Sequence, residues 1–284
     1  MSRLPASALC LLVTLGLCLT HTALGFADTK MRDGREIMEE VATRHTSDTE
    51  AALMQMVLID ESGNAQQRRF LSAGRNKGSD APHVLMRFLK PESIEGVTLL
   101  TCPEGGGLQQ YLFLPAVGES REITGEGRAG YFMGSDFTFE DLREEDMTEH
   151  EYHRRLDGEI DGQKVYVVMS VPVGVNILRA TGYAHRTLYI EKESFNICRI
   201  EFFAPGRSDP IKTLEAERFR PISQDGTSRP HRLTMRNHER GTTTVMTIQS
   251  SIIGLDLKEA WFEPDALNQW DKIQTDLLAK LEAN

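Results

Sequence analysis

The sequence lacks several features that would indicate other classes of protein. Beyond the N-terminus, no apolar run reaches the roughly 18 residues that a helix needs to span a bilayer, which excludes a polytopic membrane protein. It has no block of basic residues, and 32 Lys and Arg stand against 42 Asp and Glu, so the chain has no electrostatic footprint for nucleic acid. Its 284 residues, 40% hydrophobic and 26% charged, have the composition of a globular protein.

Cysteine is also scarce. Two of the four cysteines lie near the N-terminus, and the other two, Cys102 and Cys198, fall in separate strand-like segments. In an oxidising compartment these two could form a disulfide across a sheet, and two buried free thiols are the alternative. Neither belongs to a CxxC motif or has a catalytic signature around it.

The N-terminus has the pattern of an export signal. Arg3 precedes a short apolar run at residues 8–19, and LGFA at residues 24–27 offers small residues for cleavage. We therefore predict a signal peptide at residues 1–27, a periplasmic protein, and a single domain at residues 28–284. An uncleaved anchor is one alternative. A lipid-anchored form is another, because LGLC at residues 15–18 resembles a lipobox, but Leu17 is larger than that motif requires.

From about residue 50 the hydrophobic pattern has the period of two that is typical of β-strands. Runs of this kind, spaced by turn residues such as Asp161-Gly162, predict about eleven strands. Short links force neighbouring strands to be antiparallel, so we expect one large antiparallel sheet, strongly curved or closed. Several strands are apolar on both faces, and helices, another layer or a ligand must therefore cover each face.

Three helices are predicted. Asp33 can cap a short first helix with Ile37 and Met38 on its apolar face. A second lies within residues 130–146, where Thr138 and Asp141 form an approximate capping box. The third begins at Pro264 in a C-terminal extension, residues 264–284, with an apolar stripe that should pack on the sheet.

Motifs that would indicate catalysis or cofactor binding have the wrong context. GEGRAG at residues 125–130 fits GxGxxG, but no parallel βαβ unit surrounds it. His150 and His153 would point to opposite faces of a strand and could not share a metal ion. No GxSxG nucleophile elbow is present, and MGSD at residues 133–136 comes nearest to one. We therefore expect no enzyme, no cofactor and no metal; a hydrolase with a dispersed site is the remaining enzymatic alternative.

The most informative segment is aromatic and flanked by glycine. It can be an ordinary satellite core under a long loop, or a movable lid that closes over a cavity in the sheet. In the second interpretation Gly130 and Gly134 act as hinges, with further freedom from Gly125 and Gly127. The lid residues would be Phe132, Met133, Phe137, Phe139 and Leu142.

At this segment the chain resembles the LolA-like family of outer-membrane lipoprotein-sorting proteins. The most specific landmark is GSDFTFEDL at residues 134–142, and others are Asp33-Gly34, FLKP at residues 88–91 and YLFLPA at residues 111–116. The resemblance implies a half-open antiparallel barrel with helices on its concave side. It also implies a carrier of lipoproteins or other lipids across the periplasm, in some relatives linked to an RND-type exporter.

A carrier of this kind needs only an apolar wall. Burying an acyl chain gains roughly 0.8 kcal/mol per CH₂, so no catalytic group is required. We expect every second residue of a strand to point into the cavity and form its wall. If a strand faces the other way, the residues next to the ones named form the wall instead. The leading hypothesis is therefore a carrier that binds acyl chains, with an inner-membrane RND-type exporter or an outer-membrane acceptor as the partners to expect. The alternative is an envelope sensor or interaction module on the same fold. The predicted wall residues are Leu58, Phe70, Met86, Leu99 and Phe113.

Overall fold

The computed structural model describes residues 31–44, 46–76, 82–223 and 227–283. Arg32–Asn284 form one compact unit. The predicted signal peptide, residues 1–27, lies outside the described residues. Among the described helices, none is long and apolar enough to cross a membrane.

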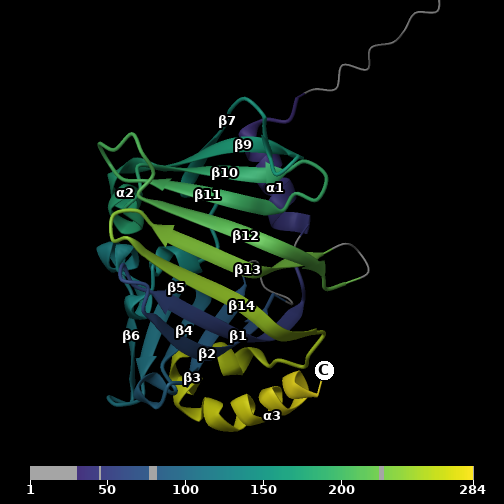
Figure 1. The fold of residues 1–284 in the computed structure, drawn as a ribbon. Coiled ribbons are helices and arrows are strands. Elements are labelled where there is room, and N and C mark those ends of the chain that lie inside the picture. The colour runs from purple at the N-terminus through teal and green to yellow at the C-terminus, as the bar shows by residue number, and fades with distance from the viewer. Residues whose placement is uncertain (1–30, 45, 77–81, 224–226, 284) are drawn as a thin grey trace, which may run out of the picture. The chain divides into compact units, whose positions relative to one another are not determined.

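One antiparallel sheet of 14 strands makes up most of this unit. Figure 1 shows the sheet curving from β9 down to β3, while β4, β5 and β6 turn away behind it; the sheet is not closed, so the fold is a half-open barrel. The strands are β1 (Thr49–Ile59), β2 (Ala65–Arg75), β3 (His83–Lys90), β4 (Thr98–Glu104), β5 (Gly107–Leu114), β6 (Glu119–Glu122), β7 (His150–Arg154), β8 (Gly158–Ile160), β9 (Gln163–Pro172), β10 (His185–Glu191), β11 (Ile197–Phe203), β12 (Lys212–Pro221), β13 (Ser228–Asn237) and β14 (Thr242–Ile253).

The predicted class, mainly β with a curved antiparallel sheet, is confirmed, but the sheet has more strands than the eleven expected. One reason is that residues 150–160 contain two strands, β7 and β8, both paired with β9. The chain leaves the sheet between them, where Arg154 and Lys192 bind the Asp157 carboxylate. Asp161 and Gly162, with φ of 49° and 81°, form the predicted tight turn between β8 and β9.

The order of the strands has one consequence for the whole molecule. The sheet runs β6-β5-β4-β3-β2-β1-β14-β13-β12-β11-β10-β9-β7, so the first and last strands, β1 and β14, pair in its interior. Its two edges, β6 and β7, follow each other in the chain. Residues 123–149 must therefore connect one edge to the other across the opening of the half-barrel. We call residues 123–149 the lid segment.

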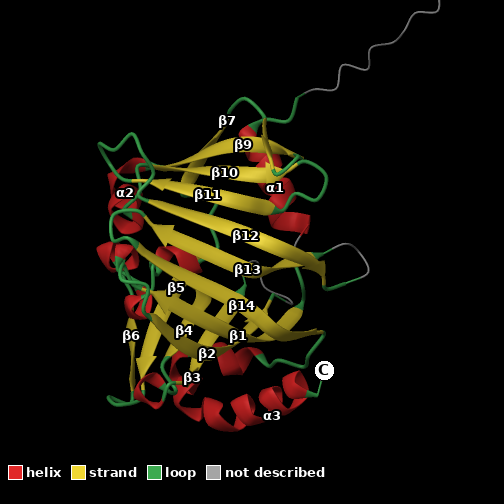
Figure 2. Ribbon diagram, in the orientation of Figure 1, coloured by secondary structure: helices red, strands yellow, loops and turns green. Residues whose placement is uncertain are grey.

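Three α-helices accompany the sheet (Figure 2): α1 (Gly34–Arg44), α2 (Gly174–Thr181) and α3 (Trp270–Glu282). Asp33 and Glu36 cap α1 with reciprocal hydrogen bonds of 2.8 and 2.9 Å between side chains and backbone N–H groups. Gly34 is required there, because a Cβ at this position would lie 2.6 Å from the Tyr152 carbonyl oxygen of β7. The helix predicted from residue 264 is confirmed as α3, after a 3₁₀ turn at Pro264–Gln269.

The helix expected within residues 130–146 is wrong. The segment contains only short 3₁₀ turns, including Phe132–Gly134 and Glu140–Leu142. The capping-box hydrogen bonds between Thr138 and Asp141 do form, at 2.7 and 3.2 Å, but they close a single turn. Positive φ at Met133 (49°) and Gly134 (75°) interrupts the helical conformation, and an isolated bridge from Tyr131 to Thr138 fixes the loop.

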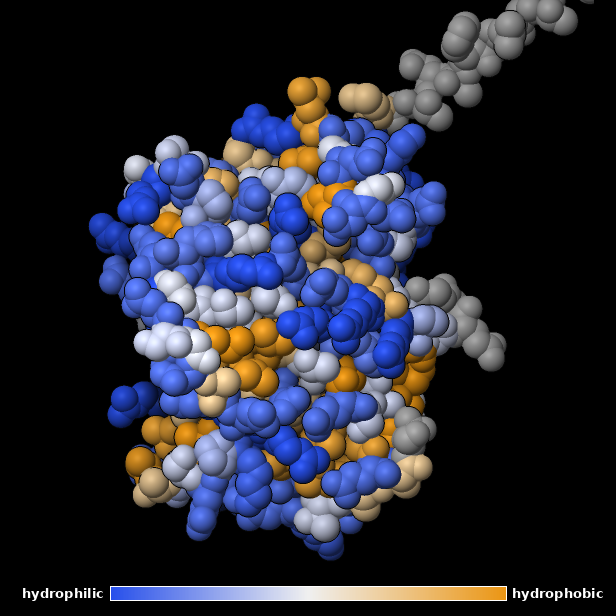
Figure 3. Space-filling model, in the orientation of Figure 1, coloured by the Kyte–Doolittle hydropathy of each residue, from blue (hydrophilic) through white to orange (hydrophobic). Residues whose placement is uncertain are grey.

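Three hydrophobic clusters lie on the two faces of the sheet. We call the face covered by the lid segment and α1 the inner face, and the opposite one the outer face. The inner face carries two clusters, one under the lid segment and one under Ile37 and Met38 of α1. The outer cluster contains Leu53, Leu71, Leu85 and Leu100 of β1–β4, and α3 covers it with Trp270, Leu277 and Leu281. The remaining surface in the view of Figure 3 is mostly hydrophilic, with hydrophobic side chains in small separate groups. Each apolar face therefore has its own cover.

The two cysteines of the described residues are free thiols, so the alternative of a disulfide is wrong for this structure. Cys102 lies on β4 and Cys198 on β11, and six strands separate β4 from β11 in the sheet. Burial raises the pKa of each thiol to about 11, which makes both unreactive at neutral pH.

The packing of α3 gives a stability prediction. Trp270 is fully buried and contacts the ring of Phe262 at 5.9 Å between centroids. We expect Trp270→Ala to lower the free energy of unfolding by about 3–5 kcal/mol, measured by urea denaturation. Lys272→Ala, at an exposed position of the same helix, should stay within about 0.5 kcal/mol of wild type. A small effect of Trp270→Ala would show that α3 is not part of the cooperative core.

Candidate functional site

The lid segment carries its aromatic side chains onto the inner face of the sheet. Phe132 is fully buried, and Phe137 is 2% exposed. The Phe132 ring stacks on Phe88 of β3 at 5.6 Å and contacts Phe139 edge-on at 5.6 Å. Phe88 in turn contacts Phe70 of β2 at 5.9 Å. The lid segment is therefore packed against the wall formed by β2 and β3.

The structure brings together nearly all the residues predicted for the lid and the wall. The inner-face cluster under the lid segment contains the five lid residues, of which Phe132 and Phe137 are buried and the other three partly buried. Four predicted wall residues belong to it as well. The members from both sets are Phe132, Met133, Phe137, Phe139, Leu142, Leu58, Phe70, Met86 and Leu99.

Phe113 is the exception, and its assignment to this wall is wrong. It belongs to the outer cluster, while its neighbour Leu112 packs on the inner one. In the β4–β5 register Phe113 lies opposite Thr98, and Leu112 lies opposite Leu99. Side chains alternate between faces, so the partner of an inward residue is itself inward. Because β5 has apolar residues on both faces, its sequence pattern could not show whether Leu112 or Phe113 points to the inner face.

The two predicted hinge glycines differ in conformation. Gly134 has a φ of 75°, which other residues rarely adopt, and no neighbour lies where its Cβ would be. Gly130 has an ordinary extended backbone with a φ of −69°. A Cβ there would lie 3.0 Å from the Gly127 carbonyl oxygen, so Gly130 is required for close packing within the loop. The hinge role remains a proposal for both.

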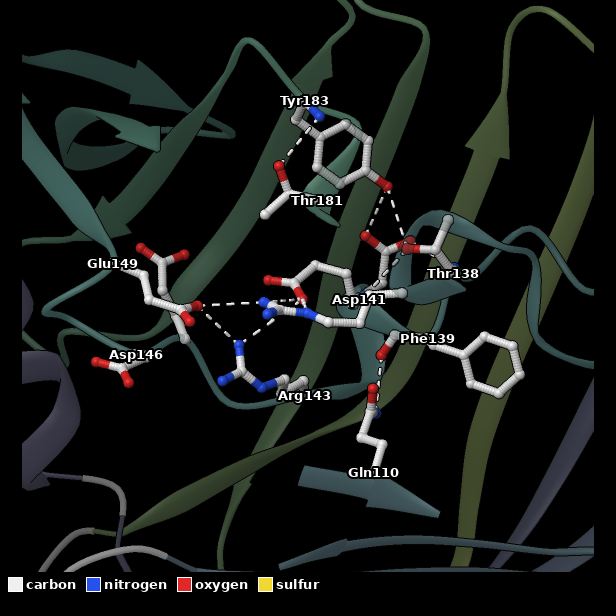
Figure 4. Close-up of polar contacts among 12 residues, drawn as sticks. Gln110, Thr138, Phe139, Asp141, Arg143, Asp146, Glu149, Thr181 and Tyr183 are labelled. Atoms are coloured by element: carbon white, nitrogen blue, oxygen red, sulfur yellow. Dashed lines mark hydrogen bonds and ion pairs between the residues drawn. The ribbon is translucent and has the colours of Figure 1, made fainter. Parts of the chain in front are cut away.

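Polar side chains attach the tip of the lid segment to the sheet. The Asp136 backbone N–H donates to Thr244 Oγ1 at 2.9 Å, and its carboxylate accepts hydrogen bonds from the hydroxyls of Thr242 and Thr244. The Asp141 carboxylate accepts from Tyr183 Oη at 2.8 Å and forms an ion pair with Lys212, as drawn in part in Figure 4. The side chains of Lys212 and Asp141 are 1% and 2% exposed. This ion pair is enclosed between lid and wall.

A second polar network fixes the lid segment where it approaches β7. Arg128 and Arg143 bind the Glu149 carboxylate at 3.1 and 2.9 Å, and Arg128 also pairs with Glu140, as Figure 4 shows around Arg143 and Glu149. Burial raises the pKa of Glu140, although the neighbouring arginines act in the opposite direction. The network therefore holds several charges away from water at the base of the lid.

Glu145 and His150 complete this network on the side of β10. Arg186 pairs with Glu145, which also accepts hydrogen bonds from Tyr152 at 2.6 Å and Ser170 at 2.8 Å. Burial alone would raise the pKa of Glu145, but Arg186 and these hydrogen bonds outweigh it and lower the pKa overall. Nε2 of His150 lies 2.9 Å from Arg186 Nη2 and accepts its hydrogen bond, which requires a neutral imidazole.

Two cavities lie beside the lid segment at one end of the inner face. One of about 280 Å³ is lined by Glu50, Ala52, Ser72, Gly74 and Val84, with Arg229 and Glu144 at its side. The other, of about 650 Å³, lies between the β4–β5 turn and residues 144–148. The lid aromatics line neither cavity. They pack directly on the wall side chains, and the open volume of these two cavities begins next to that contact.

Comparison with known proteins agrees with this architecture. A family model with the description of an uncharacterized protein matches residues 80–269, which is more than half of the chain. An outer membrane lipoprotein-sorting protein domain from Vibrio parahaemolyticus has a TM-score of 0.76 and 25% identity, over 83% of this chain and 98% of that one. The chain belongs to the LolA-like family of outer-membrane lipoprotein-sorting proteins.

Two further solved structures, each less than 25% identical to this chain, share the fold. A DUF1329 family protein from Desulfovibrio piger has a TM-score of 0.75 at 21% identity, covering 82% of this chain and 97% of that one. A LolA superfamily protein from Nitrosomonas europaea has a TM-score of 0.64 at 18% identity, covering 82% and 99%. A search of curated proteins gave no match.

Among the described residues, no group of three or more His, Cys, Asp or Glu side chains is placed to hold a metal ion.

Sequence reasoning did not find the polar residues that attach the lid. Arg186, Lys212 and Glu145 appear in the sequence as ordinary charged residues of a globular surface. One signal was available for Arg186. It lies two and four residues before the apolar Leu188 and Ile190, and side chains at this spacing in a strand point to the same face, here the inner one. Glu145 gave no comparable signal, because its burial depends on strands far from it in sequence.

The position of His150 gives a pH prediction. Burial lowers the pKa of His150 below its ordinary 6.5, and although Glu145 and Glu149 oppose this shift, Arg186 adds to it. A lowered pKa means that the folded state binds the proton less readily, so stability is present above pH 6.5 and is lost as the pH falls below it. We expect the urea concentration at the midpoint of unfolding to decline between pH 7.5 and pH 5.5 in the wild-type protein, and to decline less in the His150→Gln variant.

His153→Gln serves as the matched control, because the side chain of His153 is 49% exposed on the same strand. It should follow the pH dependence of the wild-type protein. Equal pH dependence of all three proteins would contradict the role assigned to His150.

Proposed function

We propose that this protein is a periplasmic carrier that shelters the acyl chains of a lipid or lipoprotein on the inner face of its half-barrel. Cargo would be transferred towards the outer membrane. An inner-membrane RND-type exporter is the proposed donor, and an outer-membrane acceptor the proposed recipient. Family membership supports a carrier of this general kind, and the solved relative from Vibrio parahaemolyticus is described as a lipoprotein-sorting protein domain.

The observation that carries the proposal is the contact between the lid aromatics and the apolar wall. Phe132 and Phe137 bury themselves against Phe70, Phe88 and Met86, which face the interior of an unclosed sheet. A cover of this kind is needed when a cavity is empty, because exposed aromatic surface promotes aggregation. The same wall can accept hydrocarbon when the cover moves aside.

The energies favour an exchange of lid for cargo. Full burial of a phenylalanine side chain is worth about 1.5–3 kcal/mol, so withdrawing two from the wall costs about 3–6 kcal/mol. A saturated chain of about 16 carbons gains on the order of 12 kcal/mol on full burial. The difference leaves room for the cost of ordering the chain.

The polar contacts of the lid also suit a cover that opens. When the lid separates from the wall, water can hydrate Asp141 and Lys212, which offsets the loss of their mutual attraction. A purely apolar contact would have no such compensation. Closed, the same ion pair selects one position for the lid, because any other would leave a charge buried without a partner.

Direct measurement of bound lipid tests the proposal. We expect residues 28–284, purified from an envelope fraction and extracted into organic solvent, to release lipid detectable by mass spectrometry. The emptied protein should take up a fluorescent fatty acid. Absence of both lipid and uptake would contradict the proposed function. A stable complex with a membrane protein that survives removal of the lipid would instead favour a sensor.

A pair of variants tests the role of the lid. Phe132→Ala should weaken closure and leave space on the wall, so the fluorescent fatty acid should bind at least about tenfold more tightly, a change of about 1.4 kcal/mol. The matched control is Phe262→Ala, since Phe262 is 1% exposed but belongs to the outer cluster. It should lose a similar amount of stability without a gain in affinity. Equal affinities in both variants would show that the lid does not occupy the binding surface.

A further inference from the structure

The cavities beside the lid continue the wall that the lid covers. On the inner face of β1–β3, Met54, Phe70 and Phe88 form one cross-strand row, and Phe88 stacks on Phe132. Two residues further along each strand, the next row is Ala52, Ser72 and Met86. Successive rows on one face lie about 7 Å apart. A chain bound along the wall can therefore pass from beneath the lid into the open volume.

Small side chains create this volume. The last row before the strand ends is Glu50, Gly74 and Val84, and with Ala52 and Ser72 it lines the cavity of about 280 Å³. The neighbouring cavity of about 650 Å³ shares part of this lining, including Glu144. We call the two together the end cleft. It is the place where the polar end of a chain on the wall would lie.

The end cleft contains one carboxylate with no partner of its own. Glu144 lines both cavities and is partly buried, and it forms no hydrogen bond or ion pair with any residue in the described part of the chain. Its neighbours in the lid segment differ: Glu140, Glu145 and Glu149 each pair with arginine. Burial raises the pKa of Glu144, although Arg229 acts in the opposite direction. A partly buried carboxylate that faces open volume and has no donor from the protein can accept hydrogen bonds from a ligand.

The other charged side chains of the end cleft have partners within the protein. Glu145 pairs with Arg186, and the Asp146 carboxylate accepts hydrogen bonds from Thr148. The Arg229 guanidinium binds the Glu50 carboxylate at 2.8 and 3.1 Å, and Arg75 pairs with Glu259. An anionic headgroup would have to compete with Glu50 for Arg229. A cationic headgroup would find the Glu144 carboxylate ready to accept its hydrogen bonds.

From this arrangement we infer that the end cleft binds the headgroup of the cargo, and that the headgroup carries a primary ammonium group that donates to Glu144. The acyl chain then follows the rows of β1–β3 beneath the lid. The inference rests on the proposed carrier function and adds to it a chemical class of cargo. It assigns Glu144 to headgroup binding and the lid aromatics to the chain.

Three soluble probes with the same acyl chain separate the possibilities. They are palmitoyl lysophosphatidylethanolamine, its N-acetylated derivative, which lacks the positive charge, and palmitoyl lysophosphatidylglycerol. Each competes with the fluorescent fatty acid for the emptied protein, below its micellar concentration. We expect the ammonium probe to bind at least about tenfold more tightly than the other two.

Glu144→Gln should remove this preference while the N-acetylated probe keeps its affinity. Folding of the variant is checked by its urea midpoint, which should not decrease because burial disfavours the charge that the substitution removes. Glu126→Gln, at an exposed position in the same lid segment, is the matched control and should retain the preference.

The outcomes distinguish this inference from the proposed function. Equal binding of the three probes to the wild-type protein, or a preference that Glu144→Gln leaves intact, would overturn the inference while the carrier function stands. Failure of all three probes to displace a bound fluorescent fatty acid would likewise overturn the inference alone, whereas absence of both bound lipid and fatty-acid uptake would overturn the carrier function and the inference with it.

Discussion

The two edge strands of the sheet are consecutive in the chain, and this constraint determines how the inner face is covered. Because β6 and β7 do not pair, the barrel stays open, and the residues between them must cross the opening. That crossing places Phe132 and Phe137 against the wall of β2 and β3. Opening and cover therefore arise from the same feature of the topology, since a closed barrel would need no connection across its interior.

The cover combines two kinds of contact that respond differently to water. Aromatic packing on Phe88 stabilises the closed state through burial, which a hydrocarbon guest can replace. The pair of Lys212 with Asp141 fixes the position of the lid but is compensated by hydration when it separates. The end cleft needs neither contact, because small side chains keep it open and Glu144 gives it a polar side. In the proposed carrier, the inner face would thus offer distinct surfaces for the chain and for the headgroup of one amphiphilic molecule.

Much of the fold followed from local sequence pattern. A period of two and short turns predict an antiparallel sheet, since short links cannot make parallel crossovers. Aromatic density between glycines also marked the residues that the structure packs on the inner face, while their role as a lid stays a proposal. The helix expected around Thr138 and Asp141 failed because a capping box specifies only where a turn begins, whereas contacts with the sheet and positive φ at Met133 decide how far it continues.

The sequence alone determined the class of fold, the apolar character of both sheet faces and the identity of the covering segment. Only the tertiary structure decided which face each strand residue occupies, as for Phe113, and which charges lose contact with water, as for Asp141 and Lys212. The physical reason is the separation in sequence over which each interaction acts. Periodicity and turn chemistry act between residues close in the chain, whereas facing, burial and ion pairing depend on strands brought together from distant parts of it.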